Sequence, residues 1–101
     1  MDDVIYFVSF AHVKNEYGVY EDTETLSDPI YCKVESVTRQ EFYQAGQNNF
    51  KPSYKITTFH GNYSGESLIE YEGERFSIYR TYRIPNSDYI ELYVERKTGR
   101  E

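Results

Sequence analysis

The residues that could carry nucleophilic or metal chemistry are one cysteine and two histidines. His12 and His60 fall in different predicted strands, and neither has a second histidine at metal-site spacing. Cys32 lies in an apolar strand, where a free thiol packs as a small hydrophobic side chain. A nucleophilic thiolate would need an activating base and partial exposure. We therefore expect no catalytic residue and no bound metal or cofactor; a small enzyme using Cys32 and a histidine is kept as a lesser alternative.

Acidic and glycine residues do not form a catalytic or phosphate-binding pattern. Glutamates such as Glu70 and Glu72 recur at strand spacing, which is typical of a solvated sheet face, whereas a glycosidase needs two carboxylates across a cleft. Gly61 and Gly65 flank a predicted turn and lack the Lys-Ser/Thr ending of a phosphate-binding loop.

One predicted strand combines basic and aromatic residues: Tyr79, Arg80, Tyr82 and Arg83. Such residues on a barrel strand can follow phosphates and stack on bases. Neighbouring predicted strands carry Glu70, Glu72, Glu91 and Glu95, with which we expect the arginines to pair across the sheet. An oligonucleotide-binding β-barrel that uses the four residues remains the main alternative function.

Tyrosine is unusually frequent, since the chain holds 12 Tyr and 6 Phe but no Trp. A small core cannot bury that many phenols with every hydroxyl satisfied, so we expect several to be exposed. Exposed Tyr beside Arg is typical of protein–protein contact surfaces. The same four residues are therefore also candidates for a subunit interface.

Length and charge limit the possible protein classes. A chain of 101 residues builds one domain, and its net charge of −6 disfavours an autonomous nucleic-acid binder, which needs clustered Lys and Arg. A single Cys excludes an internal disulfide framework and fits a reducing compartment. The most apolar N-terminal stretch, Val4 to Phe10, is far shorter than the roughly 20 residues of a membrane span. We expect a soluble protein made in a cytoplasm, without a membrane partner.

The dominant hydrophobic period is two, which indicates antiparallel strands. Near the C-terminus, Ile90, Leu92 and Val94 alternate with polar or charged residues. Further strands are expected over residues 4–13, 30–37, 53–60, 67–72 and 75–83. We predict a mainly β fold, a small antiparallel β-barrel of about six strands with one short helix and long loops. Closure would keep the apolar first strand from becoming a free edge.

A tight hairpin is predicted at Glu72-Gly73, because Gly73 can supply the positive φ of a two-residue turn. That turn sets Glu70 opposite Arg75 and Ile69 opposite Phe76. An opposite-charge pair and an apolar pair then fall into register together.

The one predicted helix starts with a capping box. The Thr38 hydroxyl should accept from the Glu41 amide while the Glu41 carboxylate reaches back to the helix start. Gly46 is expected to end the helix as its C-terminal glycine, and Pro52 to start the next extended segment.

Two segments are predicted to be loops. Residues 14–28 contain Lys14 against five acidic residues, a local net charge of −4, and little apolar content. We expect an exposed acidic loop between the first two strands. Residues 47–53 are polar and short of core residues, so we expect a mobile segment there.

The helix and loop carry a Ser/Thr-x-x-Glu, two aromatics, x-Ala-x-Gln pattern, which falls on Thr38, Glu41, Phe42, Tyr43, Ala45 and Gln47. This pattern resembles the head-completion (head-closure, or head–tail connector) proteins of tailed bacteriophages with long non-contractile tails. The runs over residues 69–82 and 90–97 are also similar to members from phages and prophages of Gram-positive bacteria. The resemblance covers about residues 29–97, and the acidic loop shows no family signature.

The resemblance implies a structural virion protein at the head–tail joint and not an enzyme. Such proteins form a ring, usually of twelve copies, that retains packaged DNA and provides the docking surface for the tail. The implied partners are the chain itself, a portal-side adaptor protein, a tail-completion or tail protein, and DNA that passes without sequence-specific binding. The segment near the channel would be residues 37–53, with Thr38, Glu41, Phe42, Tyr43, Ala45, Gln47, Asn48 and Asn49 as its channel or stopper residues.

The charge of the chain agrees with this placement. Twelve copies of −6 would give a ring of about −72, and acidic walls repel DNA phosphates. A ring needs two different patches on each subunit. The Tyr/Arg strand and the acidic residues Glu21, Asp22 and Glu24 are the candidate complements. Another small β-rich connector subunit, such as the tail-completion protein, remains an alternative.

Overall fold

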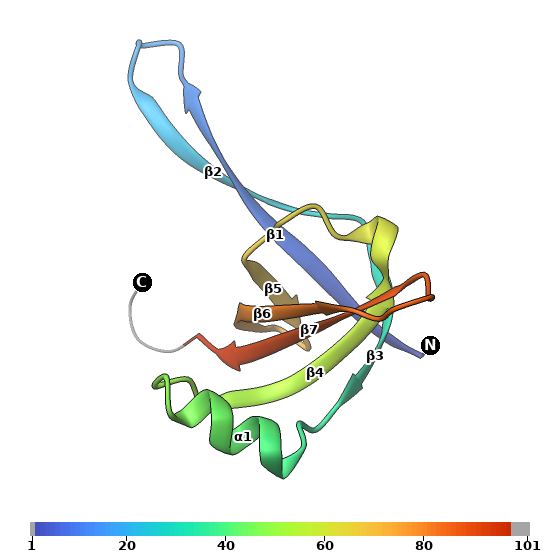
Figure 1. Cartoon of the computed structure of the whole chain (residues 1–101). Coiled ribbons are helices and arrows are strands. Elements are labelled where there is room, and N and C mark those ends of the chain that lie inside the picture. The colour runs from blue at the N-terminus through green and yellow to red at the C-terminus, as the bar shows by residue number, and fades with distance from the viewer. Residues whose placement is uncertain (1, 98–101) are drawn as a thin grey trace.

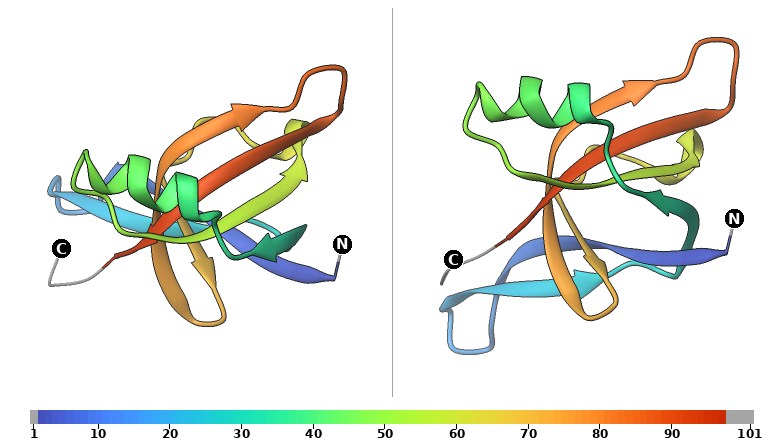
Figure 2. Two further views of the ribbon diagram at one scale, coloured as in Figure 1. Left: turned by 60° about the horizontal axis from the view of Figure 1, so that its bottom comes forward. Right: turned by 90° about the horizontal axis from the view of Figure 1, so that it is seen from below.

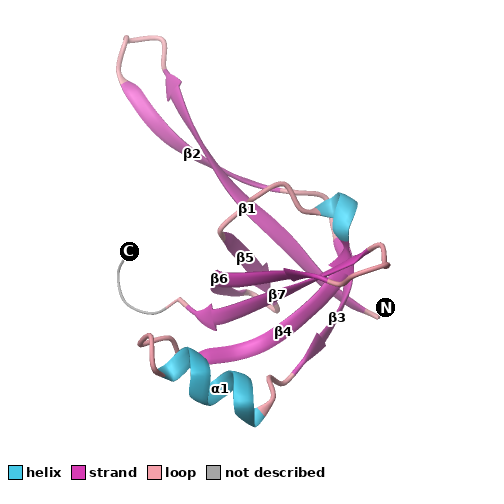
Figure 3. Ribbon diagram, viewed as in Figure 1, coloured by secondary structure: helices cyan, strands magenta, loops and turns pink. Residues whose placement is uncertain are grey.

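The computed structural model describes residues 2–97. Within this range, seven strands form one antiparallel sheet, and six of them close into a barrel (Figures 1 and 3). The strands are β1 (Asp3–Lys14), β2 (Tyr20–Leu26), β3 (Ile30–Glu35), β4 (Pro52–Phe59), β5 (Leu68–Tyr71), β6 (Glu74–Arg83) and β7 (Tyr89–Arg96). Their order is β2-β1-β3-β4-β7-β6-β5, and a further β1–β5 pairing closes the barrel. The predicted barrel of six strands is confirmed, with β2 as an additional strand.

The core lies inside the barrel and follows the predicted alternation. Ile90, Leu92 and Val94 on β7 are buried, whereas their neighbours along the strand are more exposed. They pack with inward-facing residues from five other strands: Ile5, Phe7, Cys32, Ile56, Ile69 and Phe76. The buried hydroxyl of Thr58 donates to the carbonyl of Tyr31 at 2.9 Å, so this polar group is satisfied inside.

Strand β1 pairs with three different strands along its length. Residues 3–5 pair with β3, residues 6–8 pair with β5, and residues 8–14 pair with β2. Every residue of the apolar N-terminal half of β1 is therefore paired with another strand, as the predicted closure requires to avoid a free apolar edge.

The β5–β6 hairpin has the predicted register. Glu70 lies opposite Arg75 and Ile69 opposite Phe76, and the Arg75 Nε donates to Glu70 at 2.9 Å. Both turn residues are left-handed, with φ of 52° at Glu72 and 80° at Gly73. Glycine adopts this conformation freely, but glutamate does so at a cost.

The predicted acidic loop over residues 14–28 is wrong, because most of it is strand. Residues 8–14 of β1 pair with β2 and form a hairpin arm that projects from the barrel (Figure 1). Every residue of β2 is exposed, so no core periodicity marks this strand in the sequence. Backbone pairing with β1 supplies its stability instead. The Arg75 guanidinium also anchors the arm, because it donates to both carboxylate oxygens of Glu24. This contact holds the pKa of Glu24 below its usual value.

Helix α1 (Arg39–Gly46) lies outside the barrel and ends at the predicted glycine, but by a different geometry. Gly46 does not take the left-handed conformation of a C-terminal glycine; Asn49, three residues later, does, with φ 68°.

A 3₁₀ turn, η1 (His60–Asn62), follows β4. No helix within residues 2–97 is long and apolar enough to cross a membrane. The arm and α1 lie at opposite ends of the molecule (Figures 1 and 2).

The left-handed Glu72 predicts a simple stabilising change. Glu72→Asn should raise the free energy of unfolding by about 1 kcal/mol, because asparagine tolerates this conformation in a two-residue turn. Glu72→Gln removes the same charge without easing the backbone and should leave stability nearly unchanged. Urea unfolding of the three proteins measures the difference, and equal stability of both variants would contradict the argument.

Candidate functional site

The site forms where α1 docks on β6, and the N-terminal cap of α1 sets its geometry. The Thr38 Oγ1 accepts from the Glu41 amide at 3.1 Å, which confirms the first half of the predicted capping box. This cap places Glu41 in the first helical turn on the face that also carries Ala45. These two residues are the buried face of the helix.

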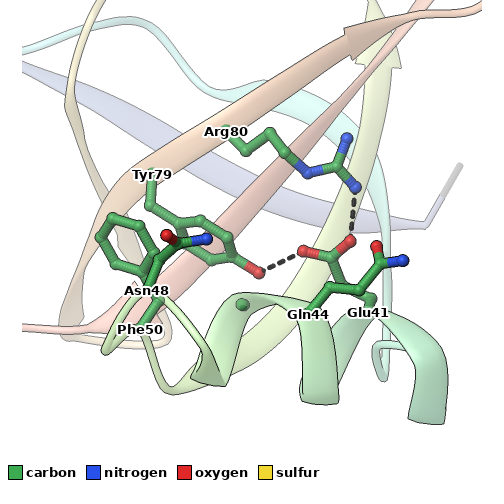
Figure 4. Close-up of a pocket in the computed structure, with 7 residues that line it drawn as sticks. Glu41, Gln44, Asn48, Phe50, Tyr79 and Arg80 are labelled. Carbon is green, nitrogen blue, oxygen red and sulfur yellow. Dashed lines mark hydrogen bonds and ion pairs between the residues drawn. The ribbon is translucent and has the colours of Figure 1, made fainter.

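The Glu41 carboxylate does not serve the helix start, so the second half of the predicted capping box is wrong. It points toward β6 instead, where the Tyr79 hydroxyl donates to Oε2 at 2.7 Å and the Arg80 guanidinium donates to Oε1 (Figure 4). Glu41 is only 8% exposed. A carboxylate removed from water this far needs charged or hydrogen-bonded partners, and both of its oxygens have one. We call Glu41, Tyr79 and Arg80 the α1 latch.

A β-bulge explains how two consecutive residues of one strand reach the same carboxylate. Neighbouring residues of a regular strand point to opposite faces. In β6, Ile78 pairs with Val94 and Arg80 with Tyr93, so the register shifts and Tyr79 is the extra residue. The bulge turns Tyr79 and Arg80 together toward α1 (Figure 4).

Aromatic rings surround the α1 latch. Phe50 stacks on Tyr79 with ring centroids 4.7 Å apart, and the Arg80 guanidinium lies 4.0 Å from the centroid of the Tyr93 ring. Burial and the hydrogen bond to Glu41 raise the pKa of Tyr79. Burial and the hydrogen bond to Glu91 raise the pKa of Tyr93 to about 12. Both phenols therefore stay protonated at neutral pH.

A small pocket of about 210 Å³ lies over the latch. Its walls come from α1, the following turn and β6: Glu41, Gln44, Ala45, Asn48, Phe50, Tyr79 and Arg80 (Figure 4). The carboxylate inside is already neutralised by Arg80, and the phenol is held protonated. The arrangement fixes a helix on a barrel and is poorly suited to proton transfer.

The predicted channel or stopper residues divide into two groups. Glu41 and Ala45 are buried against the barrel, whereas the rest are exposed: Thr38, Phe42, Tyr43, Gln47, Asn48 and Asn49. Phe42 and Tyr43 are 52% and 65% exposed, so α1 presents two aromatic rings to its surroundings. The segment is thus attached by one side and open on the other.

The predicted interface residues are partly paired within the chain. Tyr79 and Arg80 bind Glu41, so the expected pairing of Arg80 with glutamates of neighbouring strands is wrong. Tyr82 and Arg83, farther along β6, are exposed. On the arm, Asp22 binds His12 at 2.7 Å and Glu24 binds Arg75, whereas Glu21 has no such ion pair within residues 2–97.

Sequence reasoning missed Phe50 and Tyr93 as parts of the site. Phe50 belonged to the segment expected to be mobile, and Tyr93 was only the outward residue of an alternating strand. The missing signal was the bulge at Tyr79, which strand periodicity does not reveal.

Cysteine and histidine lie apart from the latch. Cys32 is fully buried in the core, and burial raises the pKa of its thiol to about 12. His12 stacks on Tyr20 in the arm, and His60 begins η1. Within residues 2–97, no three His, Cys, Asp or Glu side chains gather into a group that could hold a metal ion.

The latch predicts a measurable contribution of Glu41 to stability. Glu41→Ala should lower the free energy of unfolding by about 2 kcal/mol, because it removes two hydrogen bonds to a charged group. The half-exposed Arg80 can recover water, which keeps the loss below that of a fully buried ion pair. Glu74→Ala removes an exposed pair with Arg96 and should change stability by less than about 0.5 kcal/mol in the same urea titrations. Equal losses in the two variants would contradict the latch.

The buried thiol predicts slow alkylation. At pH 8 the folded protein should resist iodoacetamide, because Cys32 is inaccessible and its pKa of about 12 leaves almost no thiolate. Mass spectrometry should show rapid labelling after unfolding in urea, and rapid labelling of a folded Ser64→Cys variant at the exposed position 64. Rapid modification of Cys32 in the folded protein would revive the enzyme alternative.

We compared the sequence with models of known protein families and with curated proteins. The sequence model of the family described as phage head completion protein matches residues 1–97, which include the whole barrel, the arm and α1. A search of curated proteins found no significant match.

Proposed function

The chain belongs to the phage head completion protein family and is a structural component of the phage head, and from this premise we propose that it forms a ring at the head–tail joint. The ring retains packaged DNA and offers the surface on which the tail docks. Its partners are further copies of the chain, a portal-side adaptor protein and a tail-completion or tail protein. It is made in the host cytoplasm and acts in the virion.

The observation that carries the proposal is the extent of the family match. It spans the barrel together with the helix and the following loop, so the segment proposed to act at the channel belongs to the matched region. The geometry supports this role, because one side of α1 is latched to the barrel while Phe42, Tyr43 and the polar residues after them are exposed.

The charge supports passage of DNA without tight binding. Each copy carries −6, and a ring of such copies repels phosphates. The basic and aromatic residues of β6 do little to offset this repulsion. Arg80 is exposed, but its charge is paired with Glu41, which leaves Arg83 as the cation among the four candidates that is not paired with a carboxylate within residues 2–97. This pairing favours the connector role over oligonucleotide binding.

The channel segment, residues 37–53, would act by changing conformation between the free subunit and the ring. Such a change would have to exchange the two hydrogen bonds that Glu41 accepts from Tyr79 and Arg80 for contacts with neighbouring copies.

A gene deletion in the phage or prophage that encodes the chain tests the role. We expect DNA-filled heads without tails that lose their DNA, and a plasmid copy of the gene should restore tailed particles. Electron microscopy and a nuclease-protection assay provide the readout. Deletion particles that keep their DNA and carry attached tails would refute the proposal.

Hydrogen exchange tests the conformational step. Amides of residues 37–53 should gain or lose protection when the subunit enters the assembled connector, whereas core amides of β7 should stay equally protected in both states. Equal protection of residues 37–53 in the two states would contradict the change.

A further inference from the structure

The tip of the hairpin arm is an exposed surface of defined shape. The arm tip consists of Glu16, Tyr17, Val19 and Glu21, all exposed, with Tyr17 81% and Val19 57% accessible. An apolar and aromatic group at the end of a projecting arm has little left to pack against in its own chain. Exposed apolar surface of this kind marks interaction sites.

The tip is organised before any partner arrives. The Asn15 side chain accepts from the amides of Tyr17 at 2.9 Å and Val19 at 3.0 Å, and the Asn15 amide donates to the carbonyl of Val19 at 2.8 Å. Gly18 closes the turn with φ 82°. A loop fixed in this way loses little conformational entropy when it binds.

At the other end of the molecule, α1 and the turn after it form an apolar groove. The helix groove is lined by Phe42, Gly46, Asn49, Phe50 and Lys51 and has a volume of about 480 Å³. A Cβ added at Gly46 would meet nothing within 4 Å, so the helix leaves this surface open. Arg39 lies one turn before Phe42 on the same side of the helix.

Unpaired charges of opposite sign flank the two surfaces. Within residues 2–97, the side chains of Glu16 and Glu21 at the arm tip have no cationic partner. The side chains of Arg39 and Lys51 at the helix groove likewise have no carboxylate partner in this part of the chain. The other acidic side chains of β2, Asp22 and Glu24, are paired with His12 and Arg75, so Glu16 and Glu21 are the acidic groups of the arm that stay available to an external partner.

We propose that the arm tip of one copy docks in the helix groove of the next copy, with Tyr17 and Val19 against Phe42 and Phe50. Glu16 and Glu21 then face Arg39 and Lys51. The proposal rests on the proposed ring function and names the two surfaces that join its subunits. It replaces the expected pairing of the acidic residues with the Tyr/Arg strand, since Asp22, Glu24 and Arg80 are already paired within one chain.

The positions of the arm tip and the helix groove favour a contact between two copies of the chain. They lie at opposite ends of a molecule 51 Å long, so an arm tip cannot reach the groove of its own chain (Figures 1 and 2). Two different patches joined head to tail form a heterologous contact, which closes into a ring when the rotation per copy permits. Opposite charges select this pairing over tip-to-tip or groove-to-groove contacts.

Disulfide trapping between two otherwise complete chains tests the contact. One preparation carries Tyr17→Cys and the other Gly46→Cys, and the buried Cys32 stays in both. At high protein concentration and low salt, the mixed disulfide should form about tenfold faster than for the matched control pair, Ser64→Cys with Gly46→Cys, because docking raises the effective concentration of the two thiols. Equal rates for the two pairs would overturn the docking.

Charge reversal tests the complementarity. Glu16→Lys with Glu21→Lys in the Tyr17→Cys chain should slow trapping, as should Arg39→Glu with Lys51→Glu in the Gly46→Cys chain. Combining the two reversed chains should restore the rate, which a mere loss of folding would not do. Unchanged rates in the singly reversed mixtures, or no restoration in the doubly reversed one, would overturn the charge pairing.

The trapping rates and the gene-deletion particles together distinguish failure of the arm-to-groove contact from failure of the proposed function. Leaking, tailless deletion particles together with equal trapping rates would refute only the arm-to-groove contact. Rapid, charge-dependent trapping together with normal deletion particles would keep the contact and refute the connector role.

Discussion

The buried carboxylate of Glu41 is the constraint on which the placement of α1 and the surface of α1 depend. A charge that is 8% exposed must find donors, and it finds them only because β6 bulges at Tyr79. The pair of donors fixes both the position of α1 on the barrel and its rotation about its own axis. Once Glu41 and Ala45 face inward, Phe42 and Gly46 must face outward. The groove on α1 is therefore a consequence of the latch.

The sequence predicts those parts of the structure whose signals are local. Alternation in residues 90–94 indicates β7 and its buried face, and Gly73 fixes the hairpin that sets Ile69 opposite Phe76. The Thr38 cap likewise marks the start of α1 within a few residues. Each of these features depends on residues close together in the chain.

The errors arise where distant residues decide the outcome. β2 has no buried residue, so only its pairing with β1 makes it a strand. Asn49 rather than Gly46 takes the left-handed conformation, because the chain continues for another turn before it enters β4. For the site, the sequence marked α1 and the Tyr79-Arg80 pair as two separate features, a channel segment and a subunit interface. It could not join them, since the bulge depends on the registration of β6 against β7 and the acidic partner is 39 residues away from Arg80.

Strand β1 gives the arm a mechanical property. The same 12-residue strand is bonded to β3, then to β5, then to β2, so the arm is a direct extension of a wall of the barrel. A pull on the tip along the strand axis is carried as shear, in which the hydrogen bonds of several ladders resist together instead of opening one after another. The arm therefore behaves as a stiff lever set into the barrel, and strain at its tip reaches β3 and β5 without passing through a flexible joint.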